Sequence, residues 1–510
     1  MDRKEVKIYP LNRVEGDLEV FVEIEKGVVT EARSAGIMYR GFENILVGRA
    51  PLDGLVLTPR ICGICSTSHL KAAAKALDMF FKAEVPDNAK RVRNVTLIAE
   101  KMQNDFRHAF LLFMADFTNP EHKNHSLYRE AVRRYEPLKG ETAIQTIQET
   151  KKVLEIIAIL GGQWPHSSFM VPGGVVCIPS AHEINHCLFL LKNFRQWYER
   201  RVLGCTIERW LEVRNRSDLD VWLDETDSHA NSDLGFFVRF AREAGLDKLG
   251  KGHGNFISFG SMDMPENTAI KSHNNDGLFL PSGFTYNSRV HTFNQEKITE
   301  DLSHSWFSDD GAKHPFDGVT IPYASGSEGG KYSWAKAPRY DGMPAETGPL
   351  AEMVMAADPL ILDMVREDGP NVYLRELARL VRTTFLIPVM EQWLKETASC
   401  KEEFYCDHGK ANNGGGYGLV EAPRGALGHW VKIGGEKIEK YQIITPTAWN
   451  ASPRDANGVR GPWEEALIGT EIKDLDNPVE LDHIIRSFDP CLVCTVHTIN
   501  LKKRSRTIFF

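Results

Sequence analysis

Two cysteine pairs of identical spacing stand at opposite ends of the chain, each followed by a histidine: Cys62, Cys65 and His69, then Cys491, Cys494 and His497. Two residues between cysteines let both sulfurs point into one small volume, as a metal clamp requires. More than 400 residues separate the two pairs. The fold must therefore bring the two ends of the chain together.

Four thiolates are soft ligands that suit zinc, iron–sulfur clusters, copper or nickel. Zinc ribbons usually hold both pairs within tens of residues. Arg60 and Asp489 also stand directly beside the cysteines, where a purely structural site has little use for charge. A catalytic metal is therefore favoured, and structural zinc, an iron–sulfur site or two unrelated redox dithiols remain alternatives.

The composition is that of a soluble globular chain, with 42% apolar and 25% charged residues among 510. A formal net charge of −8 argues against a nucleic-acid partner. No apolar stretch approaches the roughly 20 residues of a spanning helix, so we expect no transmembrane segment. The first residues carry no apolar export signal. We therefore expect a cytoplasmic protein, which partners could associate with the inner face of the membrane.

The hydrophobic pattern predicts a mainly α fold. Residues 4–34 alternate apolar and polar side chains, which indicates strands. Helical spacing follows over 70–81, 92–113, 144–160, 180–197, 350–367 and 371–399. The ranges 252–347 and 407–470 lack a period and are rich in Gly, Ser, Asn and Pro. We predict one domain over 1–497, with a large helix-bundle core, a small N-terminal β element and long irregular covering loops.

The segments 60–69 and 489–497 resemble the two signature motifs of nickel–iron hydrogenase large subunits. Further landmarks of that family occur in the same order along the chain: Arg13-Val14-Glu15-Gly16, Arg40-Gly41-Phe42-Glu43, residues 161–174, residues 421–430 and residues 445–450. The resemblance covers nearly the whole chain. It is closest to the cytoplasmic uptake or sensing branch of the family.

The resemblance implies a nickel–iron centre. Cys62 and Cys491 would be terminal ligands of nickel, whereas Cys65 and Cys494 would bridge nickel to an iron that carries carbon monoxide and two cyanides. Dihydrogen would be split heterolytically and reversibly, in the uptake direction. The proton would pass to the thiolate of Cys491 and then to Glu15. From the pattern alone, Glu15 could instead extend an acidic, solvated strand face.

Five further residues would surround this centre. By resemblance, Arg424 overhangs the two metals beside Pro423, Asp489 holds that arginine, and Thr447 donates to a cyanide. His69, four residues after Cys65, could lie beside the thiolates and hydrogen-bond a sulfur. The alternatives without a role at the metals are that Arg424 is an ordinary interface arginine and that His69 is a helix-cap residue.

One carboxylate of the family pattern has no clear match. Many relatives place an aspartate between two histidines on the second long helix, where this chain reads Gln103-Asn104-Asp105. Gapless counting puts Asn104 at that position, with Asp105 one step round the helix. The carboxylate is therefore unassigned.

A second, hard-cation site is also implied by the resemblance. Glu43, the backbone carbonyl of Ile443 and His497 would bind magnesium, with waters completing the shell. A buried Glu–His ion pair is the alternative.

The remaining cysteines have no cluster spacing and are expected to be packing residues: Cys177, Cys187, Cys205, Cys400 and Cys406. This chain then has no relay for electrons, and the family's iron–sulfur small subunit is the implied partner. A maturation endopeptidase and nickel-insertion factors are implied too, because residues 498–510 resemble the extension that relatives lose after nickel loading. For residues 498–510, the alternative is a basic tail that is not removed. For the function of the chain, the alternatives are a dihydrogen sensor with slow turnover and a non-catalytic relative.

Overall fold

A computed structural model describes residues 3–8, 13–14, 18–272, 276–308, 310–399 and 403–491. Helices make up 46% of the structure and strands 19%, the latter divided among several small sheets. The predicted extension, residues 498–510, lies outside the described residues. The helix-rich part of the predicted fold class is therefore present, with more sheet than we expected.

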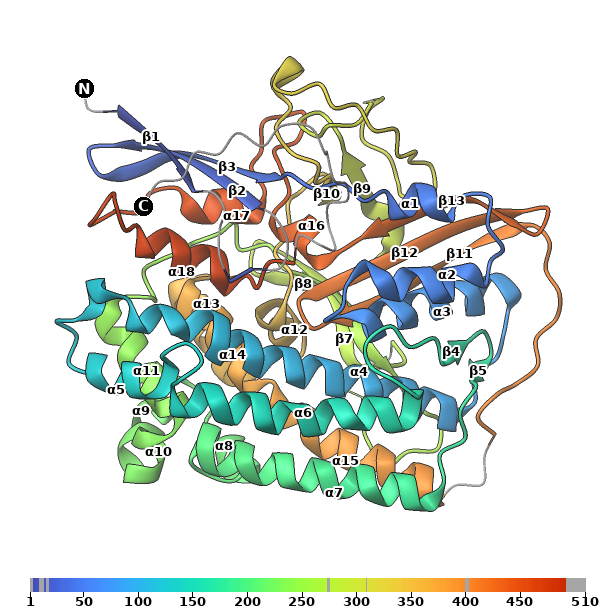
Figure 1. Cartoon of the computed structure of the whole chain (residues 1–510), viewed down its shortest axis with the longest axis horizontal. Helices are drawn as coiled ribbons and strands as arrows, with labels where there is room; N and C mark the ends of the chain where they lie inside the picture. Colours follow the sequence, from blue (N-terminus) through green and yellow to red (C-terminus); the bar gives the residue numbers. More distant parts are fainter. Residues whose placement is uncertain are drawn as a thin grey trace.

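Long helices form the lower half of the molecule as drawn in Figure 1. They are α4 (Asp87–Arg107), α6 (Glu141–Gly161), α7 (Ala181–Trp197) and α15 (Thr383–Ser399), which pack against one another. A capping box formed by Ser180 and Glu183 starts α7, as the sequence predicts. Helix α4 is buried on nearly every side, so its polar residues find partners inside the protein rather than in water.

The N-terminal strands were predicted correctly. β1 (Arg3–Ile8), β2 (Leu18–Glu25) and β3 (Val28–Gly36) form an antiparallel sheet. Leu18, Val20, Val22 and Ile24 face the core and are at most 2% exposed. The backbone of β3 and its turn bonds to residues 469–472. The N-terminal sheet therefore lies beside residues 469–472, which are far from it in the sequence.

The expectation of an irregular segment over 407–470 was wrong in its middle part. β11 (Gly414–Ala422), β12 (Gly425–Gly434) and β13 (Lys437–Ile444) form a regular antiparallel sheet. Its glycines serve packing against α3 (Ser66–Phe81). A Cβ atom on Gly418 would lie 1.9 Å from the carbonyl oxygen of Ala72, so only glycine lets the strand approach the helix this closely.

The segment 252–347 also contains more structure than predicted. β6 (Ile257–Asp263), β7 (Leu278–Tyr286) and β8 (Arg289–His291) form one sheet, and β9 (Ile298–Asp301) pairs with β10 (Ala337–Tyr340). Irregular loops between β9 and β10 lie in the upper part of Figure 1. These strands are short and are separated by polar, glycine-rich loops. The alternation of apolar and polar side chains within each strand is therefore hard to detect in the sequence.

The two later helical ranges are each divided. The first becomes α12 (Pro349–Met355) and α13 (Pro359–Asp368), and the second becomes α14 (Val372–Val381) and α15. Helix α18 (Val479–Ser487) leads to the second cysteine motif. Across the described ranges, every helix is too short or too polar to cross a bilayer.

Candidate metal centre

Three cysteines from opposite ends of the chain meet in the interior. Cys62 follows the short helix η1 (Thr58–Ile61), Cys65 caps α3, and Cys491 follows α18. Their sulfur atoms all lie within 4.8 Å of one another, and all three residues are buried. The Sγ atoms of Cys62 and Cys491 are 3.6 Å apart. Among the described residues, no other group of three such ligand side chains comes as close together.

Backbone amides orient these sulfurs. The N–H groups of Ile64 and Cys65 both lie 3.4 Å from the Sγ atom of Cys62, where they favour a thiolate. The N–H of Cys491 donates to the hydroxyl oxygen of Thr447 at 2.9 Å. Thr447 thus holds the backbone of Cys491, and no described residue accepts the proton of its hydroxyl. Cys494, Glu15 and His497 lie outside the described residues.

Arg424 and Asp489 form a buried ion pair beside the cysteines. Nε of Arg424 donates to Oδ1 of Asp489 at 2.9 Å. Burial opposes the charge of Arg424, yet Asp489 and the three thiolates hold the pKa of the guanidinium well above its usual range. Burial alone would raise the pKa of Asp489, whereas Arg424 and His108 lower it to about 2. Both groups are therefore charged at neutral pH.

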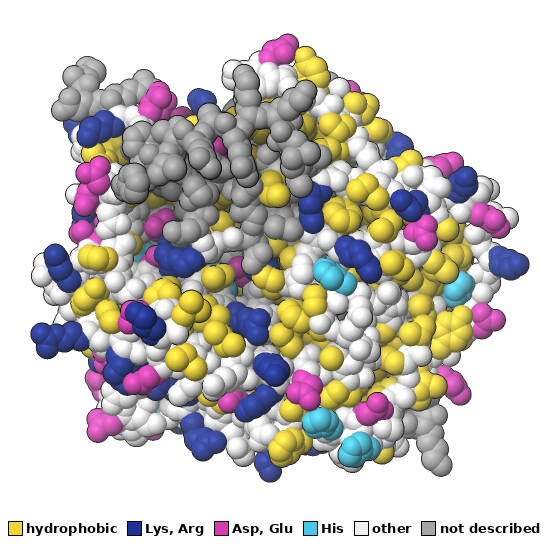
Figure 2. Space-filling view, viewed as in Figure 1, with side chains coloured by type: hydrophobic (Ala, Val, Ile, Leu, Met, Phe, Trp, Pro, Cys, Tyr) yellow, Lys and Arg dark blue, Asp and Glu magenta, His cyan; other side chains and the backbone are white. Residues whose placement is uncertain are grey.

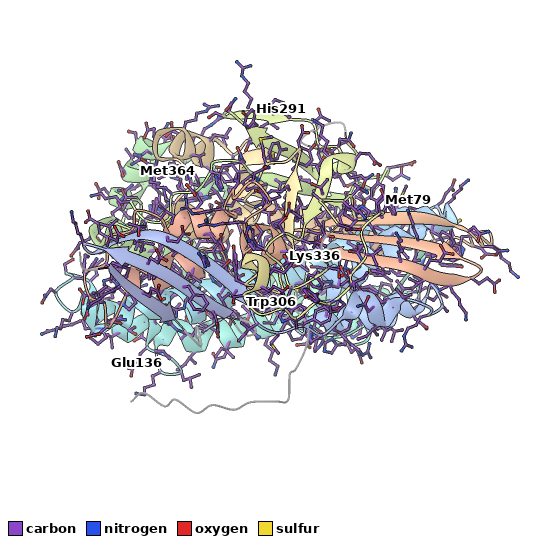
Figure 3. The ribbon with its side chains drawn as sticks, turned by 90° about the horizontal axis from the view of Figure 1, so that it is seen from above. Met79, Glu136, His291, Trp306, Lys336 and Met364 are labelled. Carbon is purple, nitrogen blue, oxygen red and sulfur yellow. The ribbon has the colours of Figure 1, made fainter. Side chains whose placement is uncertain are left out.

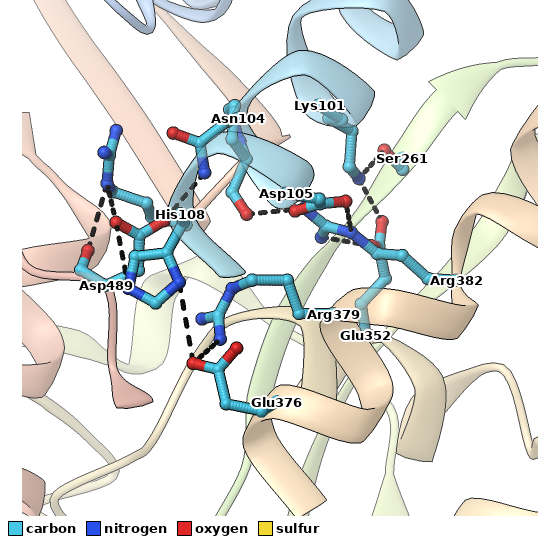
Figure 4. Close-up of polar contacts among 12 residues, drawn as sticks. Lys101, Asn104, Asp105, His108, Ser261, Glu352, Glu376, Arg379, Arg382 and Asp489 are labelled. Carbon is cyan, nitrogen blue, oxygen red and sulfur yellow. Dashed lines mark hydrogen bonds and ion pairs between the residues drawn. The ribbon is translucent and has the colours of Figure 1, made fainter. Parts of the chain in front are cut away.

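Asn104 and Asp105, the two candidates on α4, make different contacts. Nδ2 of Asn104 donates to Oδ2 of Asp489 at 2.7 Å, so Asn104 faces the centre as the helical count indicates. Asp105 turns away and pairs with Arg382 at 2.6 Å. Figure 4 shows both contacts, with His108 beneath Asp489. The amide of residue 104 therefore contacts Asp489, and the carboxylate of residue 105 contacts Arg382.

His69 begins a chain of buried hydrogen bonds. Its Nδ1 lies 3.0 Å from Nε2 of His429, and Nδ1 of His429 lies 2.9 Å from the hydroxyl of Tyr441. Burial lowers the pKa of His69 to about 4, so the imidazole is neutral at neutral pH. The contact to His429 uses Nδ1 of His69. The expected bond from this imidazole to a sulfur stays a prediction.

Glu43 lies in a separate cluster of oxygen atoms, where the sequence predicted a second cation. The ammonium of Lys336 lies 3.0 Å from Glu43, 3.4 Å from Glu300 and 2.6 Å from the Gln442 side-chain oxygen. The backbone N–H of Ile443 also donates to Glu43 at 2.9 Å. Figure 3 places Lys336 between the N-terminal sheet and the β11–β13 sheet. The oxygens are of the type that hard cations prefer, and the ammonium already neutralises part of their charge.

Sequence reasoning misplaced one arginine and missed a carboxylate. Arg60 is exposed and bonds to the carbonyl of Val56, so it does not face the cysteines. Glu100 on α4 is fully buried and accepts from the backbone N–H groups of Thr67 and Ser68, at 2.7 and 2.9 Å. It thereby caps the helix that carries Cys65. Thr96, Gln103 and Asn104 lie about one helical turn from Glu100, so no apolar face marked this carboxylate as buried.

The remaining cysteines lie apart from this centre. Cys187 is buried, whereas Cys177, Cys205 and Cys406 are partly buried. Burial raises the pKa of the Cys177 thiol to about 11. Cys400 lies outside the described residues.

Comparison with known proteins identifies the family of the chain that holds these three buried sulfurs. The model of the nickel-dependent hydrogenase family matches residues 40–134 and 232–497, which include all four cysteines of the two motifs. The chain belongs to the nickel-dependent hydrogenase family. It is a hydrogenase large subunit, an enzyme chain that acts on dihydrogen.

Its relatives are similar along their whole length. The large subunit of the periplasmic [NiFeSe] hydrogenase of Desulfomicrobium baculatum is 32% identical, with 97% of this chain and 95% of the relative aligned. The hydrogenase-2 large chain of Escherichia coli is 28% identical, with 97% of each covered. The reduced Ni-Fe-Se hydrogenase of Desulfovibrio vulgaris Hildenborough superposes with a TM-score of 0.81, at 30% identity over 97% of this hydrogenase chain and 100% of the other.

The comparison overturns the expected cytoplasmic location. The relative from Desulfomicrobium baculatum is named a periplasmic hydrogenase, and one from Wolinella succinogenes is named quinone-reactive. The expectation rested on the missing apolar stretch at the start of the chain. That argument fails for a subunit that a folded partner can carry across a membrane.

The residues at the centre fit a nickel site. Thiolate sulfurs are soft ligands of the kind that nickel accepts. Nη1 of Arg424 is buried and finds no hydrogen-bond partner among the described residues. A buried guanidinium N–H without a partner is costly, so a further acceptor beside the sulfurs would complete the site.

Proposed function

We propose that this hydrogenase subunit splits dihydrogen heterolytically and reversibly, in the uptake direction, at a nickel–iron centre held by four cysteines: Cys62, Cys65, Cys491 and Cys494. The observation that carries the proposal is the meeting of three buried sulfurs from both ends of the chain. When bound, the metals and the carbon monoxide and cyanide ligands of iron would supply the electron-rich site for dihydrogen.

Side chains of the protein would then accept the proton and stabilise the charge that develops. The thiolate of Cys491 takes the proton released from dihydrogen, and Glu15 accepts it for transfer outward. Nη1 of Arg424 offers a fixed positive charge near the reacting atoms, which stabilises developing negative charge without reorganisation. Asp489 supports this role because it binds Nε of the same guanidinium, while Nη1 has no partner among the described residues.

Three other residues would hold the centre. Thr447 can donate its hydroxyl proton to a cyanide, since its oxygen already accepts from Cys491. Pro423 restricts the backbone before Arg424 and lines the same space. His69 shapes the thiolate environment through its position one helical turn after Cys65.

Electrons would leave through an iron–sulfur small subunit. An exposed apolar surface near the first cysteine motif supports such a partner. It surrounds a groove of about 890 Å³, and its most exposed members are Leu52, Val56, Val176, Ile178 and Tyr405. Figure 2 shows hydrophobic side chains gathered over this region of α2 (Asp53–Leu57), β4 (Met170–Val171) and β5 (Gly174–Val175). Large apolar patches of this kind are typical of protein interfaces.

We also propose a magnesium site and a maturation step. Glu43, the carbonyl of Ile443 and His497 would bind magnesium next to the oxygen cluster around Lys336. Nickel-insertion factors would load the centre, and an endopeptidase would then remove residues 498–510. Intact-mass analysis of the active enzyme should give a chain that ends at His497.

Elemental analysis and infrared spectroscopy of the purified two-subunit enzyme test the central proposal. We expect nickel and iron together, with carbon monoxide and cyanide bands. Cys491→Ser should abolish nickel binding and dihydrogen oxidation, whereas the matched change Cys406→Ser should leave both intact. Zinc alone in the parent enzyme, or full nickel content in Cys491→Ser, would refute it. Glu15→Gln should keep the metals and lose most proton exchange.

A further inference from the structure

The turn that carries Arg424 is restricted on both sides. Pro423 fixes its own backbone angle φ and cannot donate a hydrogen bond. Gly425 has a φ of +123°, and a Cβ there would lie 2.4 Å from the hydroxyl of Thr347. The N–H of Ala426 donates to that hydroxyl at 2.8 Å. These contacts do not restrain the peptide plane between Pro423 and Arg424. The orientation of that peptide plane depends on what binds the Pro423 carbonyl.

Arg382 holds that carbonyl. It lies between α14 and α15, is 1% exposed, and donates from Nη2 to the Pro423 oxygen at 2.6 Å. Its Nε and Nη2 also donate to both carboxylate oxygens of Asp105, at 2.7 and 2.6 Å. Nη1 donates to Glu352 at 2.9 Å. One guanidinium therefore joins α4, α12 and the β11–β12 turn, as Figure 4 shows for its two carboxylates.

Two neighbouring residues of α4 act on opposite sides of Arg424. Asn104 bonds to Asp489, which binds Nε of Arg424 directly. Asp105 bonds to Arg382, which binds the backbone just before Arg424. One turn of a buried helix thus sets both the side chain and the backbone of this arginine.

We propose that Arg382 is a positioning residue for Arg424. Held by Asp105, it fixes the Pro423 carbonyl and so aims the Arg424 guanidinium at the cysteine cluster. This inference rests on the proposed role of Arg424 and adds to it a residue that does not touch the reacting atoms.

A simpler alternative is that Arg382 only neutralises Asp105 and Glu352. Lysine separates the two possibilities, because an ammonium keeps the charge but lacks the planar fork that holds a carboxylate and a carbonyl together. Neutralisation alone predicts that Arg382→Lys is harmless to catalysis. Positioning predicts a loss that depends on Arg424.

The test uses the two-subunit enzyme with Arg382→Lys, Arg424→Lys and the double variant. Nickel content, the infrared bands, kcat and KM for dihydrogen are measured for each. We expect Arg382→Lys to keep nickel, shift the bands and lower kcat about tenfold, with KM within about twofold. In the Arg424→Lys background it should lower kcat by less than about twofold. Arg134→Lys, at another buried arginine paired with Asp233, is the control and should leave bands and kcat unchanged.

Multiplying losses in the double variant, or parental bands and kcat in Arg382→Lys, would overturn the inference. If Arg382→Lys fails to load nickel, Asp105→Asn supplies the same test, because it weakens the grip on Arg382 without changing shape. Failure of the proposed function looks different: Arg424→Lys would then itself retain full kcat and parental bands.

Discussion

Nε of Arg424 lies 2.9 Å from Oδ1 of Asp489 and 3.0 Å from the backbone carbonyl oxygen of the same residue. The pair is almost completely buried, at 4% and 1% exposure. Two acceptors from one residue hold the guanidinium by a single edge. Nη1 is buried and has no hydrogen-bond partner among the described residues.

Asp489→Asn should keep the hydrogen bond of this pair and remove its negative charge. The amide oxygen can still accept from Arg424, but the positive charge is left without its buried partner. We expect dihydrogen oxidation to fall roughly 10–100-fold and the free energy of unfolding to fall by about 3 kcal/mol. Dye-linked activity and urea unfolding measure the two effects.

The matched control is Asp455→Asn, at the buried ion pair of Asp455 with Arg339. It should lower stability by a similar amount and leave dihydrogen oxidation near the parental rate. Equal activity losses in both variants would mean that the Arg424–Asp489 pair serves stability alone.

Glu100 gives the enzyme a predictable dependence on pH. Burial raises the pKa of this carboxyl from 4.5 to about 7, against the pull of its bonds from Thr67 and Ser68. The folded state therefore holds a proton that the unfolded chain releases. This contribution to stability is complete below about pH 4.5 and is lost as the pH rises through about 7, on the order of 3 kcal/mol in total.

Glu100→Gln should flatten that part of the profile. The free energy of unfolding, measured by urea at several pH values from 4.5 to 8, should fall less steeply with pH than in the parent. Glu155→Gln, an exposed change on α6, should keep the parental slope. An unchanged slope in Glu100→Gln would assign the pH dependence to another group.

Gly418→Ala tests the packing that supports the first cysteine motif. The added Cβ would lie 1.9 Å from the carbonyl oxygen of Ala72, so α3 and β11 must separate. We expect a loss of about 3 kcal/mol in unfolding free energy, together with lower nickel content, because Cys65 caps α3. Calorimetry and elemental analysis measure both. Gly409→Ala, whose Cβ meets no atom within 4 Å, should change neither.

The sequence predicted local features well where side chains repeat with a clear period. The alternation from Leu18 to Ile24 fixed the strands, and Ser180 with Glu183 fixed the start of a helix. The glycine-rich strand β11 was missed because its glycines reflect the closeness of α3, a tertiary fact without a local pattern.

At the centre, motif spacing identified which cysteines could meet but not how their neighbours are bonded. Asn104 and Asp105 differ by one position, yet one reaches Asp489 and the other Arg382. That choice depends on the rotation of α4 within the bundle. Arg382 itself stands in an ordinary helical stretch, so nothing in its surroundings along the chain marks it.

The negative charge of Glu43 could be neutralised by Lys336 alone or by Lys336 together with magnesium. Glu43 already accepts from the Lys336 ammonium and from the N–H of Ile443. If magnesium shares this carboxylate, chelation should lower the melting temperature of the parent enzyme, because a ligand bound only to the folded state stabilises it. Glu43→Gln should lose magnesium by elemental analysis and become insensitive to chelator. Glu296→Gln, an exposed change close in sequence to Glu300 of the same cluster, should keep both properties. A parent enzyme that contains no magnesium and melts at the same temperature with chelator would instead assign the neutralisation of Glu43 to Lys336.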